Sequence, residues 1–326
     1  MERLISRLSP VLHLTRITNA VAAVANVWFL ILWTRAAPIE QNTAPQFLLT
    51  QPLWLLLGAG LVLAIALFAY AMALNDTLDI RRDRALYPER PIPSGRISID
   101  TAVTLIAASI IVSTLAALVM GLHAGVMCLL VASAILTYNT SLKYFPSIGL
   151  VLLGLIYAAH MLIPNIRLQF VWPVWLAMTH ALLIGALTHH LLAKRPALTP
   201  PILALAGAGW LFWSGVLLAV GWRRTGHLWP EAIAPTTAIA PTLLFIAFIL
   251  LAWRKASKAT SRARAAEKIQ RYGSLWLTLY AVAWMAAEQH LAESIILASL
   301  AALGFLGMTT LREVYSLLEF PVGYRR

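Results

Sequence analysis

The sequence predicts an all-α protein that crosses a membrane several times, and composition, apolar windows and charge placement each support this fold class. Hydrophobic residues make up 60% of the 326 residues, charged residues only 12%, and the mean hydropathy is +0.77. Such values lie outside the range of soluble domains and inside that of polytopic membrane proteins. Because no repeat or Gly/Ser-rich linker divides the chain, we expect a single domain over residues 1–326.

Nearly charge-free windows, each long enough to cross about 30 Å of hydrocarbon as a helix, follow one another along the chain. The windows are 17–34, 51–75, two within 97–142 that Gly121-Leu122-His123 separates, 144–166, 168–193, 196–222, 232–253 and 272–287. They predict nine transmembrane helices. A further apolar stretch at 294–311, set off by Glu288 and Glu293, is the candidate for a tenth.

The distribution of the basic residues predicts which loops lie on the cytoplasmic side of the membrane. If residues 75–96 lie in the cytoplasm and the chain changes side at each span, 21 of the 25 Lys and Arg residues are cytoplasmic. Only Arg35, Arg167, Arg223 and Arg224 remain on the other side. This asymmetry follows the positive-inside rule, so we expect a cytoplasmic N-terminus. It also favours the tenth span, which would bring the basic chain end to the cytoplasmic side.

The net charge of +12 does not indicate nucleic-acid binding, because its basic residues lie in short loops between apolar spans and not on a polar folded surface. Attraction to anionic lipid explains them better. We expect the basic run at residues 253–271 to be a solvated loop facing the lipid headgroups. The single cysteine, Cys128, excludes an intrachain disulfide. Most tryptophans, among them Trp33, Trp172 and Trp229, fall near span ends and are expected to be interfacial anchors.

One segment, NDTLDIRRDRALYPERPIPSGR at residues 75–96, crowds ionisable groups against the end of the second span. If the helix continues past Leu74, Asp76, Asp79 and Asp83 share one face, and Asn75 adds a further oxygen. Three adjacent carboxylates repel one another unless a positive charge lies between them. Neighbouring arginines in a salt-bridge network would supply that charge, and so would Mg²⁺, which prefers oxygen ligands.

The end of this segment, YPERPIPSGR, predicts a rigid turn that returns over the aspartates. It carries Arg90 and Arg96, and the planar guanidinium of arginine suits phosphate oxygens. The segment therefore indicates a site for an anion, with or without Mg²⁺.

The segment resembles the first signature of the UbiA superfamily of intramembrane prenyltransferases, Asn-Asp-x-x-Asp-x-x-x-Asp followed by x-x-Arg-Pro-[IL]-x-x-Gly. RITNAVA, with Arg16 and Asn19, is similar to the polar opening of the family's first helix. TYNTSLKYFPSIG is similar to its Tyr-x-x-x-x-Lys-x-x-Pro-x-x-Gly segment. The latter match places Tyr138, Lys143, Pro146 and Gly149. The order of spans agrees over residues 10–290.

The resemblance implies nine helices around a central cavity that opens to lipid. It also implies an enzyme that moves an isoprenyl group from an isoprenyl diphosphate to a lipophilic acceptor, with Mg²⁺ as cofactor. Carried over by position, Asn75, Asp76, Asp79 and Asp83 would hold Mg²⁺, the three aspartates being catalytic. The expected substrate-binding residues are Arg16, Asn19, Arg82, Arg90, Tyr138 and Lys143. Tyr70, about one and a half turns before the aspartates, is added for cation–π contact.

The family's second Asp-rich motif is missing. Near residue 190, where it should follow the sixth span, the sequence reads THHLLAKRP, and no acidic residue occurs between Asp100 and Glu231. His190, Lys194 and Arg195 could grip phosphate directly and reduce the need for a second Mg²⁺. Alternatively, the segment is an ordinary interfacial helix end or, less favourably, a histidine metal site.

The sequence thus predicts an integral-membrane prenyltransferase of an atypical UbiA-like branch that lacks the second motif. Its partners would be an isoprenyl diphosphate, a lipophilic acceptor and the lipid bilayer, and not nucleic acid. The alternative is a UbiA-like protein that binds or transports lipids or isoprenoids without turnover. A secondary transporter fits less well, because its charges should lie near the bilayer midplane, whereas these lie at one membrane face.

Overall fold

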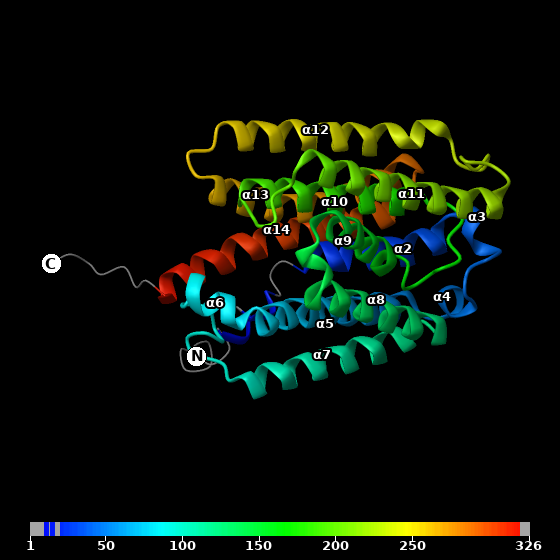
Figure 1. The fold of residues 1–326 in the computed structure, drawn as a ribbon. Coiled ribbons are helices and arrows are strands. Elements are labelled where there is room, and N and C mark those ends of the chain that lie inside the picture. Colours follow the sequence, from blue (N-terminus) through cyan, green and yellow to red (C-terminus); the bar gives the residue numbers. More distant parts are fainter. Residues whose placement is uncertain (1–9, 13, 17–19, 320–326) are drawn as a thin grey trace.

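The computed structural model of the chain is an elongated bundle of helices that run between two ends (Figure 1). It describes residues 10–12, 14–16 and 20–319, and all regular structure in this part of the chain is helical. The α-helices are α2 (Val21–Ala36), α3 (Pro38–Gln41), α4 (Gln46–Thr50), α5 (Leu53–Leu78), α6 (Ile80–Leu86), α7 (Ile99–Leu118), α8 (Leu122–Thr140), α9 (Pro146–Met161), α10 (Trp172–Leu191), α11 (Pro200–Thr225), α12 (Ile239–Ser257), α13 (Arg262–Ala287) and α14 (Leu291–Glu319). Two short 3₁₀ helices, η2 (Leu142–Tyr144) and η3 (Pro235–Ala238), precede α9 and α12.

Every predicted apolar window contains a helix. The break at Gly121 is confirmed, because α7 ends at Leu118, α8 begins at Leu122, and Gly121 adopts a φ of 107° that favours glycine. In the described chain, six helical segments are long and apolar enough to cross a bilayer: Leu53–Leu78, Ile99–Leu118, Leu122–Thr140, Trp172–Leu191, Pro200–Thr225 and Pro235–Ser257. Shorter apolar helices lie at Val21–Ala36, Pro146–Met161 and Leu291–Gly307. The chain is a multi-pass integral membrane protein.

The second span continues past Leu74 as α5, which ends at Leu78, and α6 follows directly after Asp79. One local expectation is wrong. The basic run at 253–271 is mostly helical and not a loop. Its start belongs to α12, and α13 begins at Arg262 after the Ser261 Oγ accepts a hydrogen bond from the backbone N–H of Arg264 at 3.4 Å.

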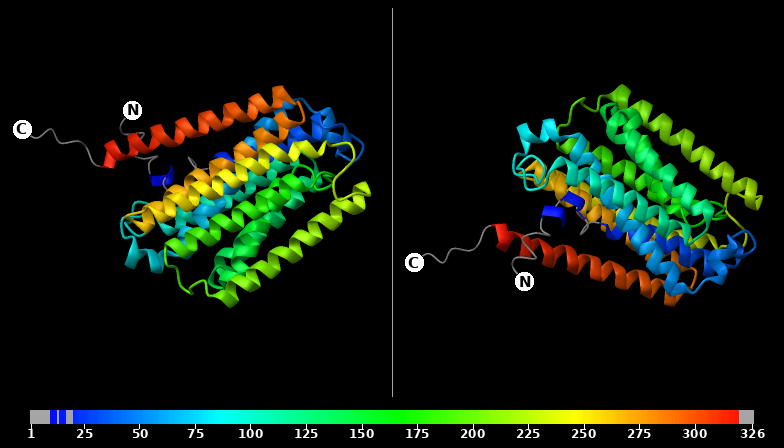
Figure 2. Two further views of the ribbon diagram at one scale, coloured as in Figure 1. Left: turned by 90° about the horizontal axis from the view of Figure 1, so that it is seen from above. Right: turned by 90° about the horizontal axis from the view of Figure 1, so that it is seen from below.

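The centre of the bundle is α2, which packs against α5, α9, α13 and α14. The peripheral helices α7, α11 and α12 leave large apolar side chains exposed, and only 11% of the apolar window of α11 is buried. Figure 2 shows α11 and α14 as outer helices in two further views. An apolar outer surface of this kind is what a bilayer solvates.

An aromatic cluster fills the core at the end of α2 that lies away from α6. Trp33 stacks on Phe170 with ring centroids 5.3 Å apart, and Phe170 meets Trp229 and Trp284 edge-on at 5.0 and 5.3 Å. Trp33 is fully buried, so it is not the interfacial anchor that the sequence predicts. These rings contribute burial and edge-to-face packing, which fix the ends of α2, α10 and α13 relative to one another.

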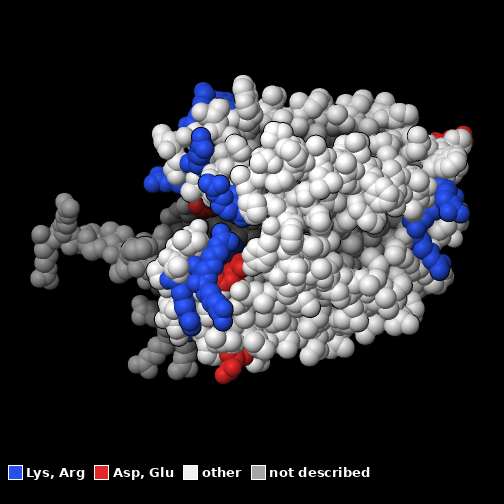
Figure 3. Space-filling model, in the orientation of Figure 1, with Lys and Arg blue, Asp and Glu red and all other residues white. Residues whose placement is uncertain are grey.

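Charged side chains gather at the two ends of the bundle and leave the broad middle of the visible face without Lys, Arg, Asp or Glu (Figure 3). At the end away from α6, Arg35 donates hydrogen bonds to Leu48 O and Gln51 O at 2.6 and 2.9 Å. Arg224 donates to Leu168 O at 2.7 Å. Two of the four basic residues predicted to lie outside therefore pair with backbone carbonyls there.

Candidate active site

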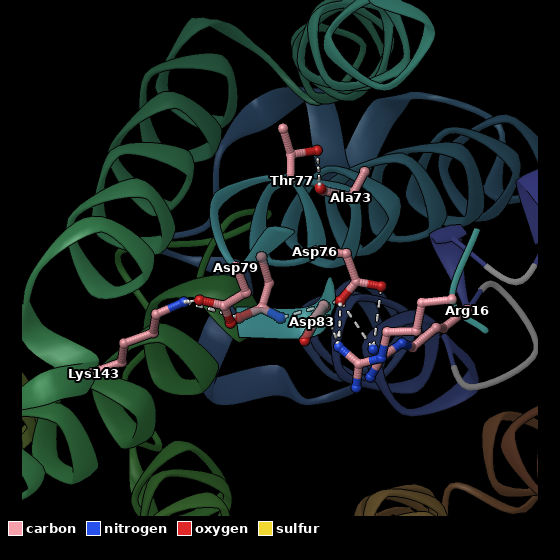
Figure 4. Close-up of polar contacts among 9 residues, drawn as sticks. Arg16, Ala73, Asp76, Thr77, Asp79, Asp83 and Lys143 are labelled. Atoms are coloured by element: carbon pink, nitrogen blue, oxygen red, sulfur yellow. Dashed lines mark hydrogen bonds and ion pairs between the residues drawn. The ribbon is translucent and has the colours of Figure 1, made fainter. Parts of the chain in front are cut away.

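The three aspartates of the 75–96 segment lie on one side of the junction between α5 and α6. Although the helix breaks at Asp79, the backbone N–H of Asp79 donates to Asn75 O at 3.0 Å, and that of Asp83 donates to Asp79 O at 2.8 Å. The helical spacing therefore survives the break, and the carboxylates stay on a common side (Figure 4). Thr77 points away from them and donates to Ala73 O at 2.7 Å.

Each of the three carboxylates is paired with a cation, and the three cations come from different parts of the chain. The Arg16 guanidinium donates to Asp76 at 3.0 Å, Lys143 Nζ to Asp79 at 2.7 Å, and Arg90 to Asp83 at 2.6 Å. Arg90 also lies 3.6 Å from Asp76. Asp76 and Asp83 are only 4% and 3% exposed, so these pairs are partly withdrawn from solvent. Charge-assisted hydrogen bonds of this kind are short and strong.

Lys143 owes its position to a close approach between η2 and α9. A Cβ atom on Gly149 would lie 2.7 Å from the carbonyl oxygen of Leu142, closer than side chains tolerate. Glycine at this position therefore lets the η2 turn sit on the first turn of α9, which Pro146 opens. From there Lys143 Nζ reaches both Asp79 and the side-chain oxygen of Asn75, the latter at 3.3 Å.

Arg90 is held by a loop that is anchored in a small apolar cluster. Ile92 and Ile97 are 4% and 6% exposed and pack with Ala73 of α5 and Ala102 of α7. The loop is thus fixed over the aspartates, as the sequence predicts for a rigid turn.

Tyr87 adds a contact that the sequence reading missed, because Arg90 lies over its ring at 4.5 Å. The Tyr87-Pro88-Glu89-Arg90 spacing was the available signal. Desolvation alone would lower the pKa of Arg90, but the Asp83 hydrogen bond and the Asp76 and Asp83 charges raise it above its ordinary value.

The α10–α11 connection lies at the same end of the bundle as α6 (Figure 2). The backbone N–H groups of Ala193 and Lys194 donate to His190 O and His189 O at 3.1 and 3.2 Å, and Ala193 has a φ of 47°. This is a Schellman-type helix end with alanine where glycine is usual. The His189 ring donates its Nε2 hydrogen to Pro196 O at 2.8 Å, which fixes the turn further.

Lys194 lies within electrostatic range of the aspartate site. Its side chain reaches solvent, but protein atoms also surround its ammonium group. The resulting desolvation, together with the charges of Arg82, Lys143 and Arg16, lowers the pKa of Lys194, while Asp79 acts in the opposite direction. The connection that carries Lys194 lies at the same end of the bundle as the aspartates.

Other predicted site residues are placed less centrally. Arg82, His190 and Arg195 are exposed at this end of the bundle. Tyr138, on α8, lies near enough to Asp79 for the carboxylate charge to act on its phenol. Tyr70 donates its hydroxyl hydrogen to Ala132 O at 3.2 Å, a contact that ties α5 to α8. Asn19 lies outside the described residues. Their roles in substrate binding remain predictions.

The donor chemistry suits a hard cation, because Asn75 and the three aspartates offer only oxygen ligands on this side. However, in the described part of the chain no three His, Cys, Asp or Glu side chains are grouped to hold a metal ion. The side chains fit a Mg²⁺ ion that is bound by one or two carboxylates and completes its shell with ligand oxygens. They do not form a ready-made cage.

Comparison with known structures supports the fold. A solved structure from work on the biosynthesis of digeranylgeranylglyceryl phosphate synthase in membranes superposes with a TM-score of 0.56 at 19% identity, covering 88% of this chain and 99% of that chain. A structure of a UbiA homolog from Archaeoglobus fulgidus bound to GPP and Mg²⁺ gives a TM-score of 0.45 at 13% identity, covering 92% of this chain and 99% of that chain. The fold and the site define a polytopic helical membrane protein whose fold is similar to that of the first of these structures.

The sequence comparison is more specific over a shorter stretch. Residues 43–166 match the model of the UbiA prenyltransferase family, so the predicted resemblance is confirmed over that segment. The segment contains α4 to α9, and with them the aspartates, Arg90 and Lys143.

Two curated relatives are digeranylgeranylglyceryl phosphate synthases. That of Sulfurisphaera tokodaii is 32% identical over 104 residues, which cover 32% of this chain and 37% of the relative. That of Saccharolobus solfataricus is 35% identical over 89 residues, covering 27% and 31%. The match thus spans about a third of the length of these relatives.

Proposed function

We propose that the protein is a UbiA-type membrane prenyltransferase that moves an isoprenyl group from an isoprenyl diphosphate to a lipophilic acceptor. The observation that carries the proposal is the set of three ion-paired aspartates at the end of a membrane-crossing helix, within the segment that matches the family. The relatives' name, digeranylgeranylglyceryl phosphate synthase, supports a reaction of this class on a lipid acceptor.

The proposed reaction develops negative charge on the leaving diphosphate, which the cations of the site could stabilise. The carbon–oxygen bond to the diphosphate breaks, its electron pair leaves with the diphosphate, and a nucleophilic atom of the acceptor captures the allylic cation and loses its proton. Arg16, Arg90 and Lys143 would stabilise the negative charge that grows on the diphosphate. Fixed cations act strongly where protein and lipid exclude water. The acceptor would enter from the bilayer that surrounds the apolar outer helices.

Mg²⁺ belongs to this proposal, with Asn75, Asp76, Asp79 and Asp83 as the residues that would hold it. When bound, it would supply further positive charge to the leaving diphosphate. The nine-helix arrangement around a cavity also belongs here.

The test is turnover by the purified protein in nanodiscs, with labelled C15–C20 isoprenyl diphosphates, Mg²⁺ and candidate lipid acceptors. We expect the label to move into lipid product with release of diphosphate. Asp76→Asn and Asp79→Asn should each reduce turnover at least about 100-fold, in line with the loss of a group that acts on transition-state charge. Asp100→Asn is the matched control, because Asp100 is exposed in the first turn of α7.

Donor consumption that is absent, or that is unchanged in both site variants, would contradict the proposal. The second candidate function, binding or transport of a lipid or isoprenoid without turnover, is favoured by one observation: every aspartate of the cluster is already neutralised by a cation. It predicts saturable binding of isoprenoid without release of diphosphate. Introducing acids with His190→Asp and Lys194→Asp separates the two, since new turnover would indicate a weakened enzyme.

A further inference from the structure

The charges at the aspartate site already balance without a metal. Asp76, Asp79 and Asp83 are paired with three cations, Arg16, Lys143 and Arg90, and Arg90 also lies 3.6 Å from Asp76. Beyond these pairs, Arg82 lies in α6, and the connection that carries Lys194 lies at the same end of the bundle. The end of the α5–α6 junction therefore carries an excess of positive charge, and a group of this sign attracts an anion and repels a free cation.

The existing ion pairs also make it less favourable in free energy for a metal ion to bind before the diphosphate does. A cation that coordinates Asp76 or Asp83 must replace an arginine partner or share the carboxylate with it. Both carboxylates are nearly fully buried, and breaking a buried ion pair leaves an uncompensated charge that is strongly destabilising. In the described residues, no other group of acidic or histidine side chains offers an alternative metal site.

We propose that the site binds the diphosphate group first, through Arg16, Arg90, Lys143 and Lys194, and that Mg²⁺ is recruited only by the bound diphosphate. This inference rests on the proposed function, because it concerns the donor of that reaction. In this order the basic loop after α10 takes the part of a second metal-binding motif, since Lys194 brings positive charge where an acid would bring Mg²⁺.

The site can hold both the diphosphate and Mg²⁺ if its arginines shift part of their hydrogen bonding from carboxylate to phosphate. A diphosphate offers several oxygens to the guanidinium groups of Arg16 and Arg90, and arginine binds phosphate in the same bidentate geometry as carboxylate. As the arginines turn part of their hydrogen bonding to phosphate, carboxylate oxygens become available. Those oxygens would then be free to hold Mg²⁺, which usually completes its shell with phosphate oxygens and would supply further positive charge to the diphosphate.

The experiment is isothermal titration calorimetry of the purified full chain in detergent, with farnesyl thiodiphosphate, a poorly reactive donor analogue, as the probe. In EDTA we expect saturable binding, with a Kd within about tenfold of the value in Mg²⁺, a difference of about 1.4 kcal/mol. Mg²⁺ titrated alone should give no saturable binding. Binding of the probe only in Mg²⁺, or saturable binding of Mg²⁺ alone, would overturn the proposed order.

Variants test the part played by Lys194. Lys194→Ala should weaken probe binding in EDTA about tenfold or more, and Lys194→Arg should keep it within about threefold, because the charge is retained. Lys258→Ala, which removes an exposed lysine from the turn between α12 and α13, is the matched control and should bind as the wild type does. Equal affinity in Lys194→Ala and wild type would contradict the role of Lys194.

Failure of this inference is distinguishable from failure of the proposed function. A protein that turns over the donor but binds the analogue only with Mg²⁺ would be a prenyltransferase with metal-first binding. Binding in EDTA without any turnover would leave the anion-first order intact and would remove the transferase assignment.

Discussion

The candidate site is made by single residues that are far apart in the chain and meet through charge. Arg16 lies 60 residues from Asp76, and Lys143 lies 64 residues from Asp79. The sequence reading identified these side chains from the motif to which each belongs. It did not anticipate that Arg90 would bridge Asp76 and Asp83, or that Tyr87 would lie beneath Arg90. Such contacts depend on the path of the loop.

Lys194 gives a prediction on pH. Its pKa is lowered from the ordinary value of 10.5, so the ammonium group loses its proton at lower pH than a free lysine does. Since only the protonated form attracts an anion, probe affinity should decline as pH rises through the range below 10.5, where a free lysine still holds its proton. Calorimetry across this range checks it. Lys194→Arg, whose charge persists, should show a smaller decline, and equal pH profiles would contradict the prediction.

Glu40 gives a prediction on stability at the opposite end of the bundle. This fully buried carboxylate accepts hydrogen bonds from the backbone N–H groups of Gln169 and Phe170, both at 2.9 Å, just before α10. Glu40→Ala should leave these donors unpartnered and lower the free energy of unfolding by about 3 kcal/mol, seen as a reduced Tm in detergent.

The control for Glu40 is Glu231→Ala, because the Glu231 side chain is 81% exposed and pairs only with His227 at the surface. Its effect should stay within about 0.5 kcal/mol. Equal shifts of Tm in the two variants would contradict a structural role for the Glu40 hydrogen bonds.

Among the secondary-structure elements, three local backbone features position the charged residues of the site. The α5–α6 break at Asp79, the η2 turn before α9, and the Schellman-type end of α10 each direct a charged residue to one place. The common face of the aspartates was expected if the helix continued past Leu74, and the preserved i to i+4 hydrogen bonds keep that face across the break. The sequence did not locate the break at Asp79.

Gly149 gives a prediction about the position of η2 relative to α9. A methyl group added there would meet the Leu142 carbonyl oxygen at 2.7 Å, so Gly149→Ala should push η2 away from α9 and move Lys143 from Asp79. We expect the affinity for the thiodiphosphate probe and kcat/KM to fall about 10–100-fold, as small displacements of a positioned group cost this much. Binding calorimetry and turnover measure the two effects.

Gly207→Ala on α11 is the matched control, since an added Cβ there meets nothing within 4 Å. It should retain wild-type binding and turnover. A loss in Gly207→Ala as large as in Gly149→Ala would show that any added methyl group harms the protein, and not the displacement of η2.

For the whole molecule, the arrangement of charges predicts the orientation in the membrane. The aspartate end should face the cytoplasm, and the turn between α11 and α12 should face the other side. In a Cys128→Ser background, His227→Cys should react with a membrane-impermeant maleimide in right-side-out vesicles. Lys258→Cys should react only after permeabilisation. The reverse pattern would contradict the predicted orientation.

The membrane-crossing helices could be predicted from the sequence, because long windows without charge have few stable alternatives to a helix in hydrocarbon. The sequence also predicts which residue types gather at one end, since charges are excluded from the membrane interior. The tryptophan anchors show the limit of this reasoning. Trp33 sits near a span end, as expected, but the rings of Phe170 and Trp284 bury it.

Which cation meets which carboxylate depends on the packing of the assembled bundle. Arg16, Arg90, Lys143 and Lys194 are all basic residues near span ends, and nothing in their spacing ranks one as the partner of a given aspartate. Helix packing makes the choice, through the close approach at Gly149, the buried isoleucines of the loop after α6, and the turn after α10. Ion pairs form only within a few ångströms, a distance that the assembled bundle sets.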